Sequence, residues 1–253
     1  MNAIPRSFSV PLSRAAAWRP GLGSGLPDAP RHSEVFASSH EGSGAALALA
    51  LAQDQLTADA LAADALATDW RPWLWVQDKS ALRLTGRPYR PGLPPQLRHR
   101  LIHVAAKSPE DALFALEEGL RCRDLAFVIG ELAGNPKALS FTASRRLSLA
   151  AEKHGVPFWL VRLDAARDLS SARLRWEARA APSPPPRWNA QAPGAGAWHA
   201  ELFRARSHPP GEWVLGEGGD GLVHGPSTGS GRAGLVFEAR PAQAELVEAH
   251  AHA

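Results

Sequence analysis

The sequence predicts an α/β fold, in which a parallel β-sheet is flanked by helices and followed by a C-terminal β extension. Apolar runs of strand length recur along the chain, and helical patterns separate most of them. Parallel strands need crossover connections, usually helices, so this alternation favours a sheet that is covered on both faces. The five apolar runs lie at residues 34–38, 72–78, 100–106, 124–132 and 157–162.

A turn of small residues directly follows the first of these strands. Residues 39–52 read SHEGSGAALALALA, which is the outline of a phosphate-binding loop followed by its helix. Such a loop carries a lysine and then Ser or Thr at the start of its helix, whereas this chain has Ala45 and Ala46 there. Gly42, Ser43 and Gly44 therefore form either a degenerate phosphate loop or a chance turn before a helix.

Two later helices carry clear end signals. Ser108 is suited to cap a helix that begins with Pro109, and leucines at helical spacing continue it to about residue 122. A second helix is predicted over residues 141–155, where Gly155 ends it. These two helices supply crossover connections between the predicted strands.

The predicted elements divide the chain into four parts. Residues 1–30 form a basic, flexible arm, and residues 31–165 form the α/β core. Residues 166–215 form a β extension, with a hairpin that turns at Pro209, Pro210 and Gly211. Residues 216–253 are of low complexity, and we expect a disordered tail.

Composition narrows the class of protein further. Arginine makes up 24 of the 28 basic residues, which suits binding of phosphate or carboxylate but also follows from GC-rich coding. Cys122 is the single cysteine, so an intrachain disulfide and a cysteine-based zinc site are excluded. The chain has no apolar run long enough to span a bilayer, and we expect a cytoplasmic protein that does not bind membranes.

Four stretches together resemble the ImuA family, whose members are RecA-like proteins of bacterial inducible mutagenesis. They cover much of residues 31–215, and the resemblance implies a RecA-like core of the P-loop NTPase type. No single motif in them is catalytic, so the resemblance depends on the whole run. The stretches read LWVQDKSALRLTGRPYRPGL, DALFALEEGLRCRDLAFVIGEL, LSFTASRRLSLAAEKHGVPFWLVR and AWHAELFRARSHPPGEW.

Position by position, the resemblance implies that the ATPase chemistry is lost. Ala45 replaces the loop lysine, and Lys79 stands where RecA-type enzymes carry the glutamate that activates water. Gly130 stands at the place of the metal-sensing aspartate, and strand alternation turns Glu131 to the other face. We therefore expect a protein that is not an enzyme and has no nucleotide cofactor or metal.

The resemblance also implies the function and the partners. ImuA-like proteins act in the DNA-damage (SOS) response with ImuB, an inactive Y-family polymerase homologue, and with a DnaE2-type error-prone polymerase. Together these proteins support mutagenic translesion DNA synthesis, and RecA or single-stranded DNA are further candidate partners. The alternative is a damage-induced inhibitor of cell division of the SulA type, and nothing in the sequence selects that partner.

Two arginine-rich stretches are the candidates for contact with a partner or with DNA. Arg173, Arg175 and Trp176 lie in DLSSARLRWEAR, where RecA-type proteins carry a DNA-facing loop, and an edge strand with its arginines in water is the alternative. Arg87 and Arg90 flank a tyrosine in RPYRPGLPPQLRHR, which fits phosphate, an acidic partner or a solvated loop.

Overall fold

The computed structural model describes residues 31–62, 69–183, 189, 191–206, 210–218 and 221–225 of the chain. These residues form a mixed α/β fold around one nine-stranded sheet, with the strand order β3-β2-β4-β5-β1-β6-β7-β8-β9. The first six strands in this order are parallel, and the last three run antiparallel to their neighbours. The predicted arm, residues 1–30, lies outside the described residues.

The parallel part of the sheet places β1 (His32–Ala37) between β5 (Phe158–Leu163) and β6 (Leu174–Ala180). The order differs from the common doubly wound orders because β4 and β5 lie between β2 and β1. The predicted strands at residues 34–38, 72–78, 100–106, 124–132 and 157–162 are confirmed with small shifts at their ends. The other strands of this part are β2 (Trp73–Gln77), β3 (Leu101–Ala105) and β4 (Val128–Ala133).

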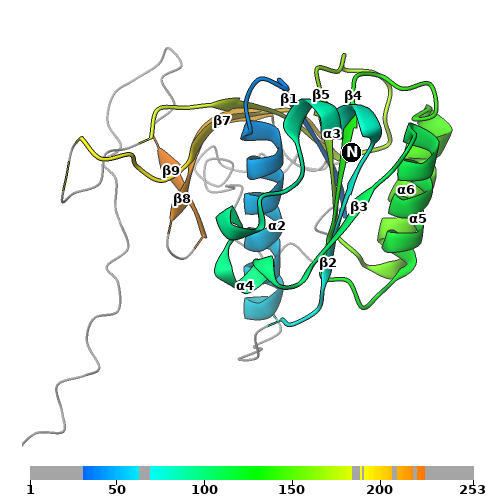
Figure 1. The fold of residues 1–253 in the computed structure, drawn as a ribbon, viewed down its shortest axis with the longest axis horizontal. Coiled ribbons are helices and arrows are strands. Elements are labelled where there is room, and N and C mark those ends of the chain that lie inside the picture. The colour runs from blue at the N-terminus through cyan, green and yellow to red at the C-terminus, as the bar shows by residue number, and fades with distance from the viewer. Residues whose placement is uncertain are drawn as a thin grey trace, which may run out of the picture.

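Helices cover both faces of the parallel sheet, as Figure 1 shows. On one face, α2 (Ser43–Ala62), α3 (Lys79–Thr85) and α4 (Pro95–Arg98) share a core with tryptophans of β2, β5 and β6. On the other face, α5 (Pro109–Arg121) and α6 (Phe141–His154) bury leucines against β2, β4 and β5. This arrangement confirms the predicted sheet flanked by helices.

The helix ends follow the predicted local chemistry. The Ser108 hydroxyl accepts a hydrogen bond from the Asp111 amide at 3.1 Å, which caps α5. Gly155 ends α6 in the left-handed conformation, with φ 72°, where a side chain would be strained. Helix α3 was not predicted, and its signal is Asp78, whose carboxylate accepts from the Ala81 amide at 2.8 Å.

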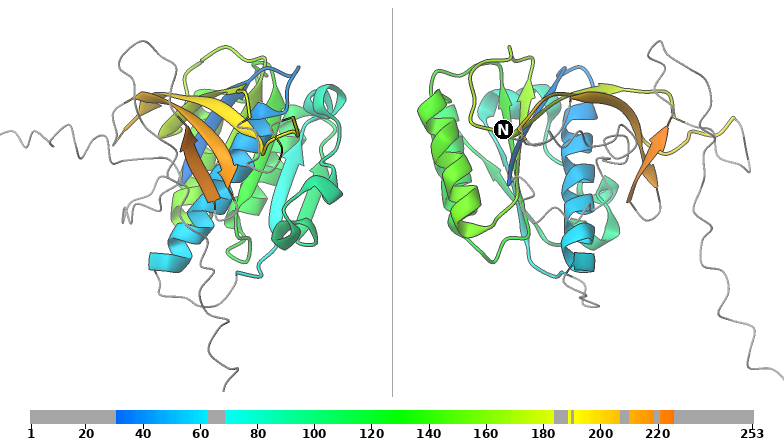
Figure 2. Two further views of the ribbon diagram at one scale, coloured as in Figure 1. Left: turned by 90° about the vertical axis from the view of Figure 1, so that its left-hand side faces the viewer. Right: turned by 180° about the vertical axis from the view of Figure 1, so that it is seen from behind.

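The antiparallel strands extend the same sheet and curl over α2, as the two views of Figure 2 show. The predicted hairpin is confirmed as β7 (Ala197–Ala205) and β8 (Gly211–Gly218). The boundary between core and extension is less sharp than predicted, because β6 pairs in parallel with β1. The extension is therefore a continuation of the core sheet.

The predicted disordered tail from residue 216 is wrong in its first part. Strand β8 continues to Gly218, and a further strand, β9 (Gly221–Gly225), pairs with it and contacts α2. Strand β9 could not be recognised in the sequence because it is rich in glycine, which provides no alternation of apolar and polar side chains. Residues 226–253 of the predicted tail lie outside the described residues.

Candidate functional site

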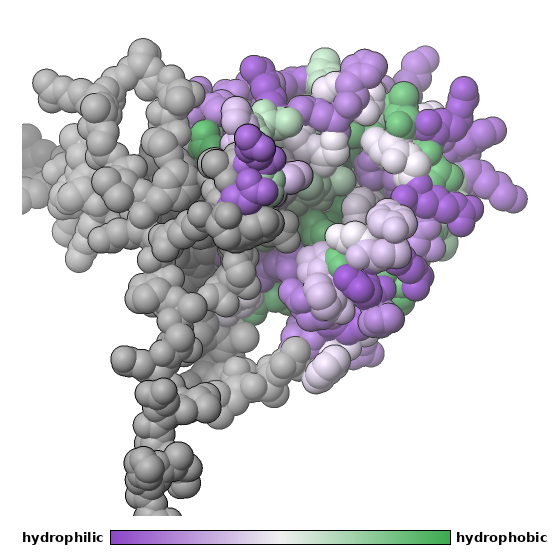
Figure 3. Space-filling view, turned by 60° about the vertical axis from the view of Figure 1, so that its left-hand side comes forward, coloured by the Kyte–Doolittle hydropathy of each residue, from purple (hydrophilic) through white to green (hydrophobic). Residues whose placement is uncertain are grey.

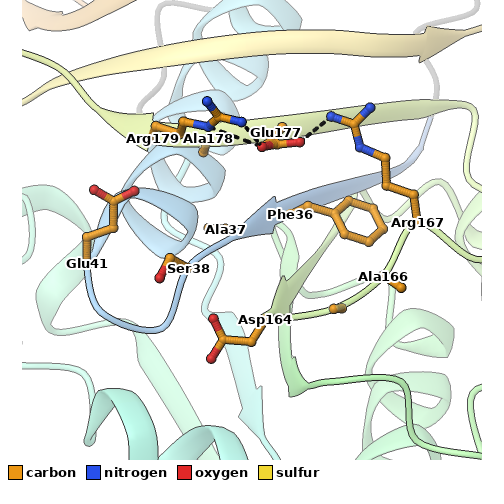
Figure 4. A pocket seen from close by; sticks show the side chains of 11 residues that line it. Phe36, Ala37, Ser38, Glu41, Asp164, Ala166, Arg167, Glu177, Ala178 and Arg179 are labelled. Atoms are coloured by element: carbon orange, nitrogen blue, oxygen red, sulfur yellow. Dashed lines mark hydrogen bonds and ion pairs between the residues drawn. The ribbon is translucent and has the colours of Figure 1, made fainter.

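The carboxyl ends of β1, β5 and β6 meet at one edge of the sheet and enclose a pocket of about 590 Å³ (Figure 4). Ligands of open α/β sheets bind in the crevice beyond the carboxyl ends of the strands. The loop that resembles a phosphate-binding loop contributes to the wall of this pocket. The lining residues are Phe36, Ala37, Ser38, Glu41, Asp164, Ala165, Ala166, Arg167, Glu177, Ala178 and Arg179.

Two of the three small residues of the loop, Ser43 and Gly44, hold α2 close to the sheet. A Cβ atom on Gly44 would lie 2.6 Å from the Cβ of Ala37 and 3.0 Å from Cγ1 of Val161. Ser43 is buried, and its hydroxyl donates to a carboxylate oxygen of Glu41 at 3.0 Å and to the Ala178 carbonyl at 3.3 Å. Gly44 therefore serves helix–strand packing, and the Ser43 hydroxyl is engaged within the protein.

We expect Gly44→Ala to lower the free energy of unfolding by about 1–3 kcal/mol, the usual cost of overpacking. The added methyl group would collide with the backbone-anchored Ala37, which cannot move aside as a flexible side chain would. Chemical denaturation measures the effect. Gly42→Ala is the matched control, because a Cβ there meets nothing within 4 Å, and a cost equal to that of Gly44→Ala would contradict the packing role.

Two carboxylates, those of Asp164 and Glu41, accept hydrogen bonds at or beside the loop. Asp164 accepts a hydrogen bond from the Ser39 amide at 3.0 Å. Hydrogen bonding to Ser39 lowers the pKa of Asp164, and the charge of His40 adds a smaller effect in the same direction. The second carboxylate of the pair, Glu41, accepts from the Ala180 amide at 2.9 Å and from Ser43. Glu41 of the loop and Asp164 after β5 thus place two carboxylates near the start of α2, where a nucleotide would bring its own negative phosphates.

The two arginines of the pocket are paired with acids. Glu177 lies between Arg167 and Arg179 in Figure 4 and forms an ion pair with each of them. The guanidinium of Arg167 also contacts Glu201 at 3.1 Å. With three carboxylates and two arginines among the lining residues, the pocket offers no surplus positive charge to a phosphate.

The structure places Gly130 and Glu131, the two residues at the position that the resemblance assigns to the metal-sensing acid, on β4. Gly130 and Glu131 do face opposite sides of the sheet, but Gly130 faces Leu116 of α5, and Glu131 faces the side of α2 with Trp75. Glu131 therefore lies on the side of the sheet that α2 covers. Gln77 and Thr85 donate to its carboxylate at 2.9 and 2.8 Å.

The same carboxylate of Glu131 is sequestered inside the protein. The residue is 1% exposed, and Trp75 supplies a third donor at 3.1 Å. Burial raises the pKa of Glu131, while its hydrogen bonds act in the opposite direction. Lys79, the predicted replacement of the water-activating glutamate, is exposed at the first turn of α3. Among the described residues no cluster of His, Cys, Asp and Glu could hold a metal ion.

A buried ionic network lies beneath the pocket, on the α6 side of β1, β5 and β6. The Glu34 carboxylate accepts from Arg175 Nε and from the Ser170 hydroxyl, both at 2.7 Å. Arg162 lies 3.7 Å from the same carboxylate and bonds to Asp168 at 3.2 Å. The side chains of Glu34, Arg162 and Arg175 are 0, 1 and 4% exposed.

This network overturns the prediction that Arg175 and Trp176 contact a partner or DNA. Arg175 is held inside the sheet by Glu34, and Trp176 is 1% exposed in the core with α2. The prediction failed because β6 is an internal strand of the sheet, which rules out both the DNA-facing loop that the resemblance implied and the edge strand that was its alternative. Arg173 alone of this group is partly exposed, and it pairs with Glu152 at 2.6 Å.

His32 extends the buried polar region towards α6. Its Nδ1 lies 2.6 Å from the Ser148 hydroxyl, and its ring stacks on Phe158 with 4.7 Å between ring centroids. Burial lowers the pKa of His32 from 6.5 to about 3, and the charge of Arg175 adds to this effect. The imidazole is therefore neutral in the folded protein throughout the physiological range.

We expect the folded state to lose stability as the pH falls from 6.5 towards 3. The unfolded chain protonates His32 near pH 6.5 and the folded chain only near pH 3, so acid favours unfolding by up to about 1.4 kcal/mol per pH unit from this group. Denaturant titrations at pH 7.0 and 5.5 should show a smaller loss for His32→Asn than for the wild type. His99→Asn, at an exposed site, is the control, and an equal slope in all three proteins would contradict the assignment.

Two acidic residues of the pocket, Asp164 and Glu41, were not predicted as site residues from the sequence. Asp164 follows β5 directly and Glu41 lies within the loop, so both positions were readable, but their meeting depends on the order of β1 and β5 in the sheet. The predicted contact residues Arg87 and Arg90 are exposed between α3 and α4, away from the lining of the pocket.

No protein-family model matches the chain, and a search of curated proteins returns no significant match. Among the described helices, none combines the length and apolarity needed to cross a membrane. The fold is a mixed α/β fold in which the loop after the central strand β1 is hydrogen-bonded to two carboxylates, Glu41 of the loop and Asp164 after β5.

Proposed function

We propose that the protein is a non-catalytic accessory protein of SOS-induced, error-prone translesion DNA synthesis, with a RecA-like core of the P-loop NTPase type. The resemblance to the ImuA family supplies the process and the partners. By this proposal it acts in the cytoplasm with an ImuB-like inactive polymerase and a DnaE2-type polymerase.

The observation that carries the non-catalytic part is the occupied loop after β1. The order of strand β1, small-residue turn and long helix α2 supports the proposed relation to a phosphate-binding unit. In this region the Asp164 carboxylate accepts a hydrogen bond from the Ser39 amide, and the Glu41 carboxylate accepts one from the Ser43 hydroxyl. A nucleotide would have to displace two carboxylates without the lysine that normally offsets its charge, so binding is strongly disfavoured.

The hydrogen bonds that fix the connection from β5 to β6 also support a scaffold role. The connection from β5 to β6, where the resemblance implies a DNA-facing loop, is fixed by Asn135, which bonds to Ala166 and to Asp168. Ser144 of α6 holds the same connection through Ser170 and Ser171. Partner contact is therefore assigned to surfaces outside the parallel sheet and outside this connection.

Gene deletion tests the proposed process. Loss of the gene should lower the damage-induced mutation frequency without slowing undamaged growth, and expression of the full chain should restore it. An unchanged mutation frequency would refute the proposal. If deletion instead abolished damage-induced filamentation, the protein would be a cell-division inhibitor of the SulA type.

A further inference from the structure

One segment of the chain carries strong positive charge and no acid. Residues 79–109 contain seven Lys or Arg residues and no Asp or Glu, and they form α3, the 3-10 turn η1 (Arg90–Gly92), α4 and β3. Five of these cations are exposed, as is the ring of Tyr89, at 75%. The exposed cations are Lys79, Arg83, Arg87, Arg90 and Lys107.

These cations differ from the other arginine-rich region in how their charge is compensated. Within the part of the chain that the structure describes, none of the seven forms an ion pair with an acid. By contrast, each arginine between residues 162 and 179 contacts at least one carboxylate. Segment 79–109 is therefore a continuous stretch of the described chain whose positive charge no carboxylate of its own and no ion pair offsets.

Hydrogen bonds gather this segment along the β3 edge of the sheet. Gln77 at the end of β2 donates to the Gly86 carbonyl at 2.9 Å, which fixes the chain just before Arg87. Arg90 donates to the Leu101 carbonyl of β3 at 3.2 Å. Arg87 and Arg90 both help to lower the pKa of His103 on β3, although burial contributes most.

The ends of β2 and β3 complete the surface. β2 and β3 are parallel neighbours in the sheet. Lys79, which follows β2, and Lys107, which follows β3, therefore lie at the same carboxyl end of these two strands. In Figure 3, where the side of α2 and α4 comes forward, hydrophilic side chains predominate on the coloured part of the surface. We name the five exposed cations and Tyr89 the β3-edge surface.

We propose that the β3-edge surface binds single-stranded nucleic acid. Exposed cations without acidic partners attract a phosphate backbone, and guanidinium groups bind phosphate in a bidentate fork. An exposed aromatic ring among such cations is a stacking platform for an unpaired base, which an acidic protein segment would not use. This inference adds a ligand to the accessory role and rests on that proposed function for its biological setting only.

Fluorescence anisotropy with a labelled oligothymidylate of about 20 nucleotides tests the proposal, a length that exceeds the common site size of single-strand binders. The double variant Arg83→Ala/Arg87→Ala should bind at least tenfold more weakly than the wild type. Its log–log salt slope should fall by about 1.4, because each phosphate contact on a single strand contributes about 0.7. Both residues are exposed, so the melting temperature should stay unchanged.

The matched control is Arg145→Ala/Lys153→Ala, which removes two exposed cations from α6 on the opposite side of the sheet. It should bind the oligonucleotide as the wild type does, whereas equal weakening of both double variants would overturn the proposal. Tyr89→Ala should weaken binding several-fold at unchanged net charge. If Tyr89→Ala had no effect and polyglutamate of equal charge competed fully, the surface would be a site for acidic proteins and the proposal would be refuted.

Absence of oligonucleotide binding by the wild-type protein would also refute it. That result would leave the damage-induced mutation frequency of the deletion strain untouched. Failure of this inference and failure of the proposed function are therefore distinguishable.

Discussion

Arg175→Glu should unfold the protein or lower its free energy of unfolding by at least about 3–5 kcal/mol, the usual cost of breaking a buried ion pair. Arg175 supplies the 2.7 Å bond to Glu34, which is fully buried on β1. The substitution would place two carboxylates together inside the sheet and leave Arg162 as their main counter-charge. Urea denaturation followed by circular dichroism measures the loss.

The matched control for this prediction is Arg173→Glu, which makes the same change two residues away. Arg173 is about one third exposed and pairs with Glu152 at a similarly exposed site. Exposed pairs contribute about 1 kcal/mol or less, so this variant should stay folded. If Arg175→Glu were as stable as Arg173→Glu, the buried network would not have the structural role assigned to it.

Ending the chain after Trp213 should also cause a large loss of stability. The truncation removes the rest of β8 and all of β9, including Leu215, which is fully buried in the core with α2. Loss of one buried leucine side chain alone costs about 2–5 kcal/mol, and the truncation also deprives β7 of the end of its partner strand. Thermal unfolding followed by circular dichroism should show a clearly lower midpoint.

The comparison protein for the truncation ends at Gly225 and keeps every residue that the structure describes. The difference in melting temperature between the two truncated proteins isolates the contribution of residues 214–225. Equal melting temperatures would show that the end of β8 and β9 do not stabilise the core, and would support a dispensable tail from residue 216.

The fold could be predicted from the sequence because its strands and helices carry local signals. The sequences of β2 and β5 are mostly apolar, which is typical of buried parallel strands. Ser108 before α5 and Gly155 after α6 are residues that commonly cap helix ends, so they indicate where these helices begin and end. Strand β9 lacked such a signal. The short helix α3 also escaped notice, because seven residues give too little periodicity to recognise.

The site was predictable in part, because strand order decides which residues meet. The sequence indicated the loop of Gly42, Ser43 and Gly44, and the structure places it at the carboxyl edge of β1. Nothing local to Arg175 distinguishes a buried arginine from a wet one, since its partner Glu34 lies 141 residues away.

Titration of the purified full chain with a fluorescent ATP analogue and magnesium tests the central claim, that this loop no longer serves a nucleotide. The account predicts no saturable binding up to about 1 mM analogue, an affinity worth only about 4 kcal/mol. It also predicts no ATP turnover above background with or without single-stranded DNA. Saturable binding that inorganic triphosphate competes for, or turnover that a substitution of Ala45 or Lys79 abolishes, would contradict the account.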